Sequence, residues 1–191
     1  MIFLELPQTL VGNEQPIAYH TNVTQEIDYE AELAAVIGES ARNVSLDEVL
    51  DYVARYTILN DTSARDLQFG FQVGDDNLID WFSGKAMTNT TPAGPYVVID
   101  EIDDPQSLEI ASHVNGDTLQ DDNTQMMIQS VAELVAFVSS WVELTPGDLV
   151  ATGTPECVGT FQDIKLEGGD TVTVEIEWIG KLENTVEATG R

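Results

Sequence analysis

The sequence has very little positive charge. Only seven Lys and Arg residues stand against 34 Asp and Glu residues in a chain of 191, which gives a formal net charge of −27. Binding to nucleic acid needs basic residues that displace counterions from the phosphates, so no nucleic acid partner is expected. An anionic membrane surface is not expected as a partner either, because its charge has the same sign as that of the protein.

Cysteine and long apolar segments are also scarce. Cys157 is the only cysteine, so an intrachain disulfide is excluded and we interpret this residue as a buried or idle thiol. No stretch approaches the 18 apolar residues of a membrane span. The first seven residues lack the basic segment of a signal peptide. We therefore expect a soluble, cytoplasmic protein.

The rest of the composition predicts a folded chain. Hydrophobic residues make up 42% of the sequence, with three Trp, six Phe and five Tyr, which is enough for an apolar core. The acidic residues are scattered and do not form a tail. A folded protein this rich in acids and this poor in Lys is expected to be adapted to high salt, where its self-repulsion is screened. The alternative is an ordinary acidic cytosolic protein.

The periodicity predicts one β-rich α+β domain over residues 1–191, with two or three short helices. Ser45 with Glu48 and Ser130 with Glu133 have the spacing of capping boxes. The first box predicts a helix with Val49, Leu50, Val53 and Tyr56 on one face, and the second predicts a helix that ends near Trp141. A hairpin turn is expected at Asn115-Gly116. Strands are expected at residues 29–38, 56–59, a buried one at 96–99, and at 108–114, 149–154 and 172–178.

Glu30 and Glu32 are candidates for a cation site. Residues two apart point to the same face of a strand about 7 Å from each other, and two neighbouring carboxylates repel unless a cation or proton neutralises them. Oxygen ligands suit Mg²⁺, Mn²⁺ or Ca²⁺. Asp61 follows the next predicted strand and is either a third ligand or the cap of a helical turn. For the glutamates, the alternative is a solvated strand face.

Two basic residues stand out because bases are so rare. Arg65 is expected to bind a substrate carboxylate through its guanidinium fork, or else to pair with Asp66 or another nearby acid. Lys85 follows a glycine and precedes small residues. Its ammonium group either stabilises an enolate oxygen and moves a proton, or forms a surface salt bridge. His20 is expected in a polar loop and His113 on the polar face of a strand, and we interpret both as solvated.

Several segments, taken in order, resemble the catalytic domain of the fumarylacetoacetate hydrolase family. The similarity covers nearly the whole chain. The matching segments are Asp28-Tyr29-Glu30-Ala31-Glu32-Leu33-Ala34, Asn60-Asp61-Thr62-Ser63-Ala64-Arg65-Asp66-Leu67-Gln68, Gly84-Lys85, Pro92-Ala93-Gly94-Pro95, Val114-Asn115-Gly116, Pro146-Gly147-Asp148-Leu149, Thr152-Gly153-Thr154-Pro155 and Val158-Gly159.

This resemblance implies a mixed, rolled β-sheet structure with a few short helices, usually in a homodimer. It implies that Glu30, Glu32 and Asp61 bind Mg²⁺ or Mn²⁺, with Ca²⁺ as a further candidate. Members of the family hydrolyse, decarboxylate or isomerise small 2-oxo acids. The residues that the resemblance places around the substrate are Arg65, Gln68, Lys85 and Thr154.

The expected activity is therefore that of a divalent-metal-dependent enzyme that stabilises an enolate, as a 2-hydroxyhepta-2,4-diene-1,7-dioate isomerase or an acylpyruvase does. Arg65 and Gln68 would bind the substrate carboxylate, Lys85 would handle the enolate or a proton, and Thr154 would contact an oxyanion or water. Family members carry an upstream lid segment with a His and a Glu that positions the hydrolytic water, and it is absent from this chain. Either the chain is shortened, or it performs a reaction that needs no activated water, for which tautomerisation and decarboxylation are the better candidates. The alternative is a catalytically silent cation-binding domain that kept the fold.

Overall fold

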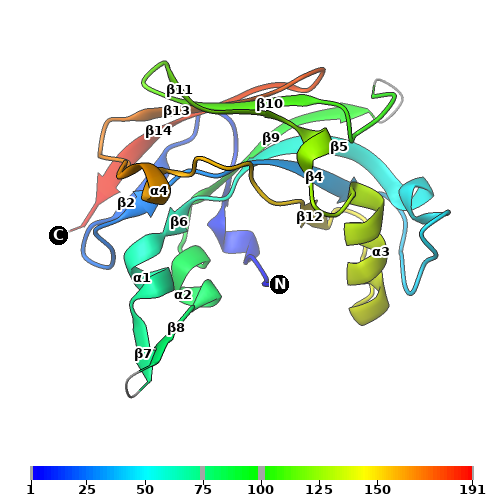
Figure 1. Cartoon of the computed structure of the whole chain (residues 1–191), viewed down its shortest axis with the longest axis horizontal. Coiled ribbons are helices and arrows are strands. Elements are labelled where there is room, and N and C mark those ends of the chain that lie inside the picture. Colours follow the sequence, from blue (N-terminus) through cyan, green and yellow to red (C-terminus); the bar gives the residue numbers. More distant parts are fainter. Residues whose placement is uncertain (1, 74–75, 99–101, 191) are drawn as a thin grey trace.

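Two five-stranded sheets make up most of the computed structural model, which describes residues 2–73, 76–98 and 102–190. They lie one above the other in Figure 1. The first sheet has the strand order β1-β9-β5-β4-β12 and is antiparallel except for the β1–β9 pair. Its strands are β1 (Leu10–Val11), β9 (Thr91–Val98), β5 (Val53–Asn60), β4 (Ala31–Ile37) and β12 (Leu149–Ala151).

The second sheet has the order β11-β10-β13-β14-β2. It is antiparallel except for the β14–β2 pair, so both sheets are mixed, as expected from the resemblance. Its strands are β11 (Asp117–Asn123), β10 (Glu109–Val114), β13 (Thr171–Ile176), β14 (Gly180–Thr189) and β2 (Ile17–His20).

Short elements surround the sheets. Two-stranded pairs form from β3 (Ile27–Asp28) with β6 (Ser63–Ala64) and from β7 (Phe71–Val73) with β8 (Asp76–Leu78). In Figure 1 the β7–β8 hairpin projects below one end of the sheets together with α1 and α2. Helix α3 projects below the other end, and the N-terminal segment lies between the hairpin and α3. The helices are α1 (Arg65–Phe69), α2 (Trp81–Lys85), α3 (Val131–Trp141) and α4 (Gly159–Gln162).

The main core lies where the two sheets face each other and is closed at one end by α3. Along β10 and β13 buried and accessible residues alternate, as the pleat of a half-buried strand requires. All seven residues of β4 are buried, which places in the interior the strand that contains Glu32 and begins directly after Glu30. Leu33 of β4 lies opposite Ile58 of β5, and both are fully buried. Burial of each side chain is worth about 1.5–3 kcal/mol.

The helix predicted after the first capping box is wrong. The structure has only a 3-10 helix at Val49–Tyr52, and Val53 already begins β5. The Ser45 hydroxyl donates to the Glu48 side chain at 2.8 Å and caps no helix. Apolar spacing over so few residues suits either structure. The extended form prevails because Val53 and the residues after it pair with β4.

The second capping box is confirmed. The Ser130 side chain accepts from the backbone N–H of Glu133 at the start of α3, and the Glu133 side chain accepts from the backbone N–H of Ser130. The hairpin turn at Asn115-Gly116 is also confirmed, with positive φ at both residues.

Three strand predictions need correction. Residue 178 is not in a strand, because β13 ends at Ile176 and Trp178 has a φ of 65° in the turn before β14. The strand expected at 149–154 ends at Ala151. The strand expected at 96–99 is the end of the longer strand β9, but Tyr96 is exposed, and residue 99 lies outside the described residues.

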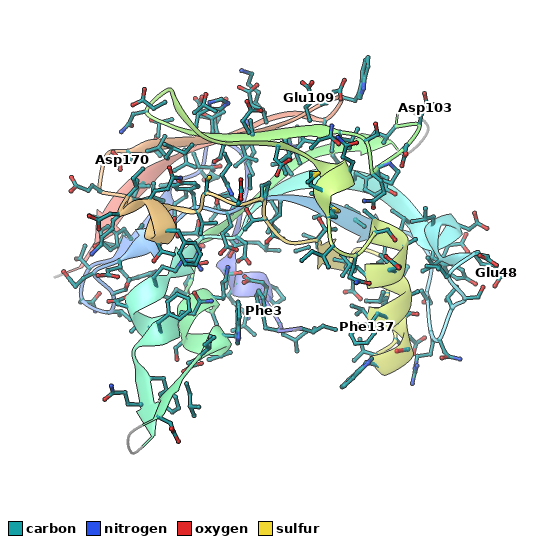
Figure 2. The ribbon with its side chains drawn as sticks, in the orientation of Figure 1. Phe3, Glu48, Asp103, Glu109, Phe137 and Asp170 are labelled. Atoms are coloured by element: carbon teal, nitrogen blue, oxygen red, sulfur yellow. The ribbon has the colours of Figure 1, made fainter. Side chains whose placement is uncertain are left out.

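The acidic side chains leave a strongly negative surface. In Figure 2 the labelled Glu48, Asp103, Glu109 and Asp170 lie at the edges of the molecule. Twenty-seven net negative charges over 10168 Å² correspond to about one per 380 Å², close enough for mutual repulsion at low ionic strength. Within the described ranges, no helix is long and apolar enough to cross a membrane.

Removal of salt is expected to destabilise the fold. We expect the melting temperature in 10 mM KCl to lie about 10 °C below that in 2 M KCl, which corresponds to about 3–4 kcal/mol. Calorimetry across a KCl series measures the shift, with sucrose at matched osmolarity as a control for preferential exclusion. A melting temperature that does not depend on KCl would instead favour an ordinary acidic protein.

Candidate metal centre

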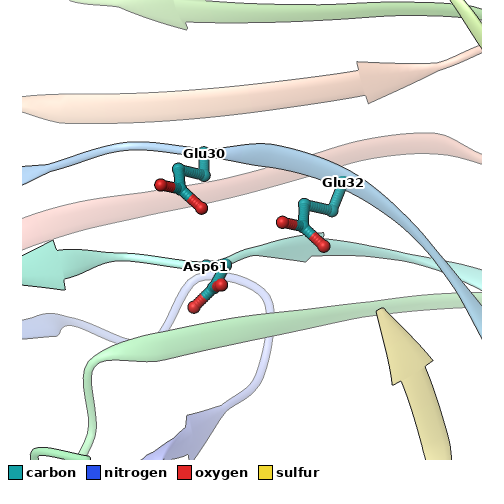
Figure 3. A group of neighbouring side chains, drawn as sticks. All are labelled: Glu30, Glu32 and Asp61. Carbon is teal, nitrogen blue, oxygen red and sulfur yellow. The ribbon is translucent and has the colours of Figure 1, made fainter. Parts of the chain in front are cut away.

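The pairing of β4 with β5 brings the three candidate carboxylates together. Ala31, the first residue of β4, lies opposite Asn60, the last residue of β5. Glu30 and Asp61 therefore flank this pair, and Glu32 follows two residues later on the same side of its strand. Figure 3 shows the three side chains directed into one space. Each offers an oxygen, and these oxygens all lie within 4.8 Å of one another.

Lys85 lies inside this acidic group. Its side chain is 0% exposed, and its ammonium nitrogen is 2.6 Å from Asp61 Oδ2 and 2.9 Å from Glu30 Oε2. It also donates to the Asp61 carbonyl oxygen at 3.0 Å. The surface salt bridge considered for Lys85 is therefore wrong, because the ion pair is buried.

Arg65, at the start of α1, holds the other side of the group. Its Nε donates to Asp28 Oδ2 at 2.8 Å, its Nη2 to Glu30 Oε1 at 2.6 Å and its Nη1 to Gln68 Oε1 at 2.8 Å. The ion pair with Asp66 considered from the sequence is not formed. Asp66 instead accepts from the backbone of Gln25 and from the hydroxyl of Thr24.

The charges of this buried group do not balance. Asp28, Glu30, Glu32 and Asp61 are four carboxylates, and Arg65 and Lys85 supply two positive charges. Two negative charges remain. Glu32 is 4% exposed and has no ion-pair partner within the described ranges; its Oε2 accepts only from the backbone N–H of Gly153 at 2.9 Å.

The residues present fit one divalent cation. All the converging ligands are oxygens, which Mg²⁺, Mn²⁺ and Ca²⁺ prefer. Asp61 Oδ1 is buried and accepts no hydrogen bond from the described residues. A buried acceptor without a partner is costly, and a cation at this oxygen would satisfy it. Such an ion would also supply the two positive charges that the group lacks.

Burial and the repulsion between neighbouring carboxylates raise the pKa values of two carboxyl groups. Burial, together with Asp61 and Glu30, raises the pKa of Glu32 well above its usual range. Burial raises the pKa of Asp61 to about 7, although Lys85 acts in the opposite direction. Burial alone would lower the pKa of Lys85, but Asp61 and Glu30 outweigh it and raise that pKa, so the ammonium group stays charged. Protonation and cation binding thus relieve the same repulsion.

The remaining predicted site residues, Gln68 and Thr154, lie next to residues that contact this group. Gln68 is fully buried beside Arg65, and because its Oε1 accepts from Arg65, its Nε2 is left without a partner among the described residues. Thr154 lies in the loop after β12, next to the glycine that donates to Glu32. The seven residues predicted from the sequence therefore lie in one region of the fold.

Two further parts of the region were missed from the sequence. Asp28 occurs in the quoted motif, but its role depends on its contacts with Arg65 and with the backbone of Gly159, 131 residues away. Phe3 stacks on Trp81 at 5.1 Å between ring centroids, and the Lys85 nitrogen lies 5.5 Å from the Phe3 centroid. No local pattern indicates either contact.

The other titratable residues discussed above lie outside the group. His20 ends β2, not a loop as interpreted, and contacts the Thr88 carbonyl oxygen through Nε2 at 2.8 Å. His113 contacts Thr118, and its Nε2 is 3.7 Å from Glu175. Cys157 is free and exposed.

Comparison with known proteins gives one consistent match. The model of the C-terminal domain of fumarylacetoacetate hydrolase matches residues 1–187. The mitochondrial oxaloacetate tautomerase fahd2 from Xenopus laevis is 39% identical over 97% of this chain, which spans only 57% of that relative.

Solved structures show the same fold. The 2-hydroxyhepta-2,4-diene-1,7-dioate isomerase from Mycobacterium marinum superposes with a TM-score of 0.88 at 38% identity, over 100% of this chain and 70% of that one. Fumarylpyruvate hydrolase from Pseudomonas aeruginosa, solved with Mn²⁺ and pyruvate, has a TM-score of 0.86 at 31% identity, over 98% and 78% of the two chains.

Proposed function

The chain belongs to the fumarylacetoacetate hydrolase family, and we propose that it is a divalent-metal-dependent enzyme that acts on small 2-oxo acids by stabilising an enolate. The observation that carries this proposal is the buried group of four carboxylates and two bases, which lacks two positive charges. The tautomerase and isomerase activities of the relatives support the same class of chemistry.

In this proposal Glu30, Glu32 and Asp61 hold the cation, with Mg²⁺ or Mn²⁺ as candidates. A divalent cation at this position would polarise the 2-oxo group and stabilise negative charge on its oxygen. The Mn²⁺ and pyruvate in the Pseudomonas structure belong to a relative, and they support this choice of metal and ligand class.

Lys85 supplies the second positive charge. Its ammonium group is fixed by Glu30 and Asp61, so it needs no reorganisation when charge develops on a nearby oxygen. Because it lies in a water-poor interior, its interaction with an enolate is stronger than it would be in water. Because this ammonium group stays charged, we propose that the proton it moves is one that it donates to the enolate.

Gln68 is the stronger candidate for direct contact with the substrate carboxylate. Its Nε2 is buried and has no partner among the described residues, so it can donate to an incoming oxygen. Arg65 fixes this orientation by donating to Gln68 Oε1, while its own charge is shared between Asp28 and Glu30. We propose that both residues serve carboxylate binding, with Gln68 making the contact and Arg65 orienting it.

Enolisation or decarboxylation suits these residues better than hydrolysis does. Both reactions pass through an enolate that a cation and Lys85 would stabilise, whereas hydrolysis also needs an activated water. Neither histidine of the chain contacts the acidic group. The homodimer, which the family resemblance implies, and the cytoplasmic location, which was expected from the sequence, stay predictions.

Turnover assays of three reactions test this proposal. We expect Mn²⁺-dependent interconversion of the enol and keto forms of oxaloacetate, followed by absorbance in 2 M KCl, and loss of this activity when the metal is removed with EDTA. Pyruvate formation reports decarboxylation in the same samples, and cleavage of an acylpyruvate reports hydrolysis. Mn²⁺ binding without any of the three reactions would favour the silent cation-binding domain.

A further inference from the structure

The geometry points to Gln120 as a positioning residue of the proposed active site, one that makes the hydroxyl of Thr154 a hydrogen-bond donor toward the substrate. The inference rests on the proposed function. Gln120 lies on β11 of the second sheet and is 2% exposed. Its side chain connects this sheet to β4 on one side and to the loop after β12 on the other.

The orientation of the Gln120 amide follows from its neighbours. The backbone N–H of Ala31, between Glu30 and Glu32, donates to Gln120 Oε1 at 3.1 Å. The Ser112 hydroxyl donates to the same oxygen at 3.0 Å. A backbone N–H can only donate, so the atom that faces it must be the amide oxygen. Nε2 therefore faces the opposite way.

On that opposite side, the two N–H bonds of Nε2 face three oxygens of one loop. They are Thr154 Oγ1 at 2.9 Å, the Pro155 carbonyl at 3.0 Å and the Glu156 carbonyl at 3.3 Å. An amide nitrogen cannot accept, so Thr154 Oγ1 must be the acceptor in this contact. The hydrogen of the Thr154 hydroxyl is then free, and within the described ranges it has no other recorded partner.

Thr154 directly follows a residue that contacts the acidic group. Gly153, the neighbour of Thr154, donates its N–H to Glu32 Oε2 at 2.9 Å. A hydroxyl whose acceptor side is already occupied is oriented in advance to donate to an oxygen that gains negative charge. The Gln120 side chain thus holds the backbone between two candidate ligands and also leaves the Thr154 hydroxyl as a hydrogen-bond donor.

The test is a double-mutant cycle on Mn²⁺-dependent oxaloacetate tautomerisation. Gln120→Glu keeps the oxygen that faces Ala31 and replaces the donor that faces Thr154. We expect it to lower kcat about 10- to 100-fold, and Thr154→Val to lower kcat about 100-fold. Thr154→Ser keeps a hydroxyl and should stay within about threefold of the unmodified protein. The double variant should be no slower than the slower single variant.

Oxalate, which resembles an enolised 2-oxo acid, gives a readout besides activity. Calorimetric titration of oxalate into the Mn²⁺-loaded protein should show about tenfold weaker binding in Gln120→Glu and Thr154→Val and unchanged binding in Thr154→Ser. The affinity for Mn²⁺ alone should change by less than about threefold in Thr154→Val. If Gln120→Glu does not fold, Gln120→Met removes the same donor without adding charge.

Two results would overturn this inference alone: a Gln120 variant with unchanged kcat and oxalate affinity, or effects of the two substitutions that multiply in the double variant. The second result would mean that Gln120 acts as a general support of the loop. If the unmodified protein bound no Mn²⁺ or left 2-oxo acids unchanged, the proposed function would fail and this inference with it.

Discussion

Replacement of Lys85 by Met is expected to destabilise the metal-free protein by about 3–5 kcal/mol and to lower turnover at least 100-fold. Lys85 is fully buried between Asp61 and Glu30. Without it, these two carboxylates are left in the interior with Glu32 and only Arg65 as a counter-charge. The loss of turnover follows because the enolate would lose the positive charge that the protein itself supplies.

Mn²⁺ separates the two effects of this substitution. An ion held by the carboxylates replaces part of the lost charge, so Mn²⁺ should raise the melting temperature of Lys85→Met more than that of the unmodified protein, while turnover stays low. Thermal unfolding with and without Mn²⁺ measures the first effect. Lys165→Met removes an exposed lysine that pairs with Glu26 and should change neither quantity. Full turnover in Lys85→Met would contradict the role given to the ammonium group.

Replacement of Glu32 by Gln is expected to weaken Mn²⁺ binding about 100-fold or more. Glu32 is the carboxylate of the group without an ion-pair partner, and the substitution keeps its shape while removing its charge. Loss of residues that only support metal ligands already costs about 10- to 100-fold in affinity. The metal-free protein should be as stable as before, or more stable, because a buried unpaired charge is removed.

Glu109→Gln is the matched control, since Glu109 lies on the surface of β10 (Figure 2). It removes the same charge from the chain and should leave Mn²⁺ affinity unchanged. Isothermal titration of both variants in 2 M KCl makes the comparison. Equal Mn²⁺ affinities in Glu32→Gln and the unmodified protein would mean that Glu32 is not a ligand of the cation.

Only part of the acidic group was predictable from local rules: the third ligand, Asp61, was selected by the family resemblance, and Asp28 was missed. Glu30 and Glu32 share a face through the period of two, and Asp61 follows the end of an apolar strand. The surroundings of these residues could not be predicted from the sequence. The burial of Lys85 depends on a contact with Glu30, 55 residues away, and the contact of Gln120 with Ala31 spans 89 residues.

The fold was predictable to a similar degree. Strict alternation identified β10 and most of β13, and the capping box at Ser130 identified α3. The segment from Val49 to Tyr56 was assigned to a helix because its apolar spacing suits both structures, and only pairing with β4 decides between them. The mixed, rolled β architecture was expected from the family resemblance and not from any single segment, and the strand order of the two sheets was not predicted.

The most direct test of the central claim is a calorimetric titration of Mn²⁺ in the presence and absence of oxalate. We expect one Mn²⁺ site per chain, an affinity that oxalate increases at least tenfold, and the loss of both in Glu32→Gln. The coupling is expected because an ion at the carboxylates and the donors of Gln68 and Lys85 would contact the same small acid. Mn²⁺ binding that does not depend on oxalate would contradict the account and leave only a cation site.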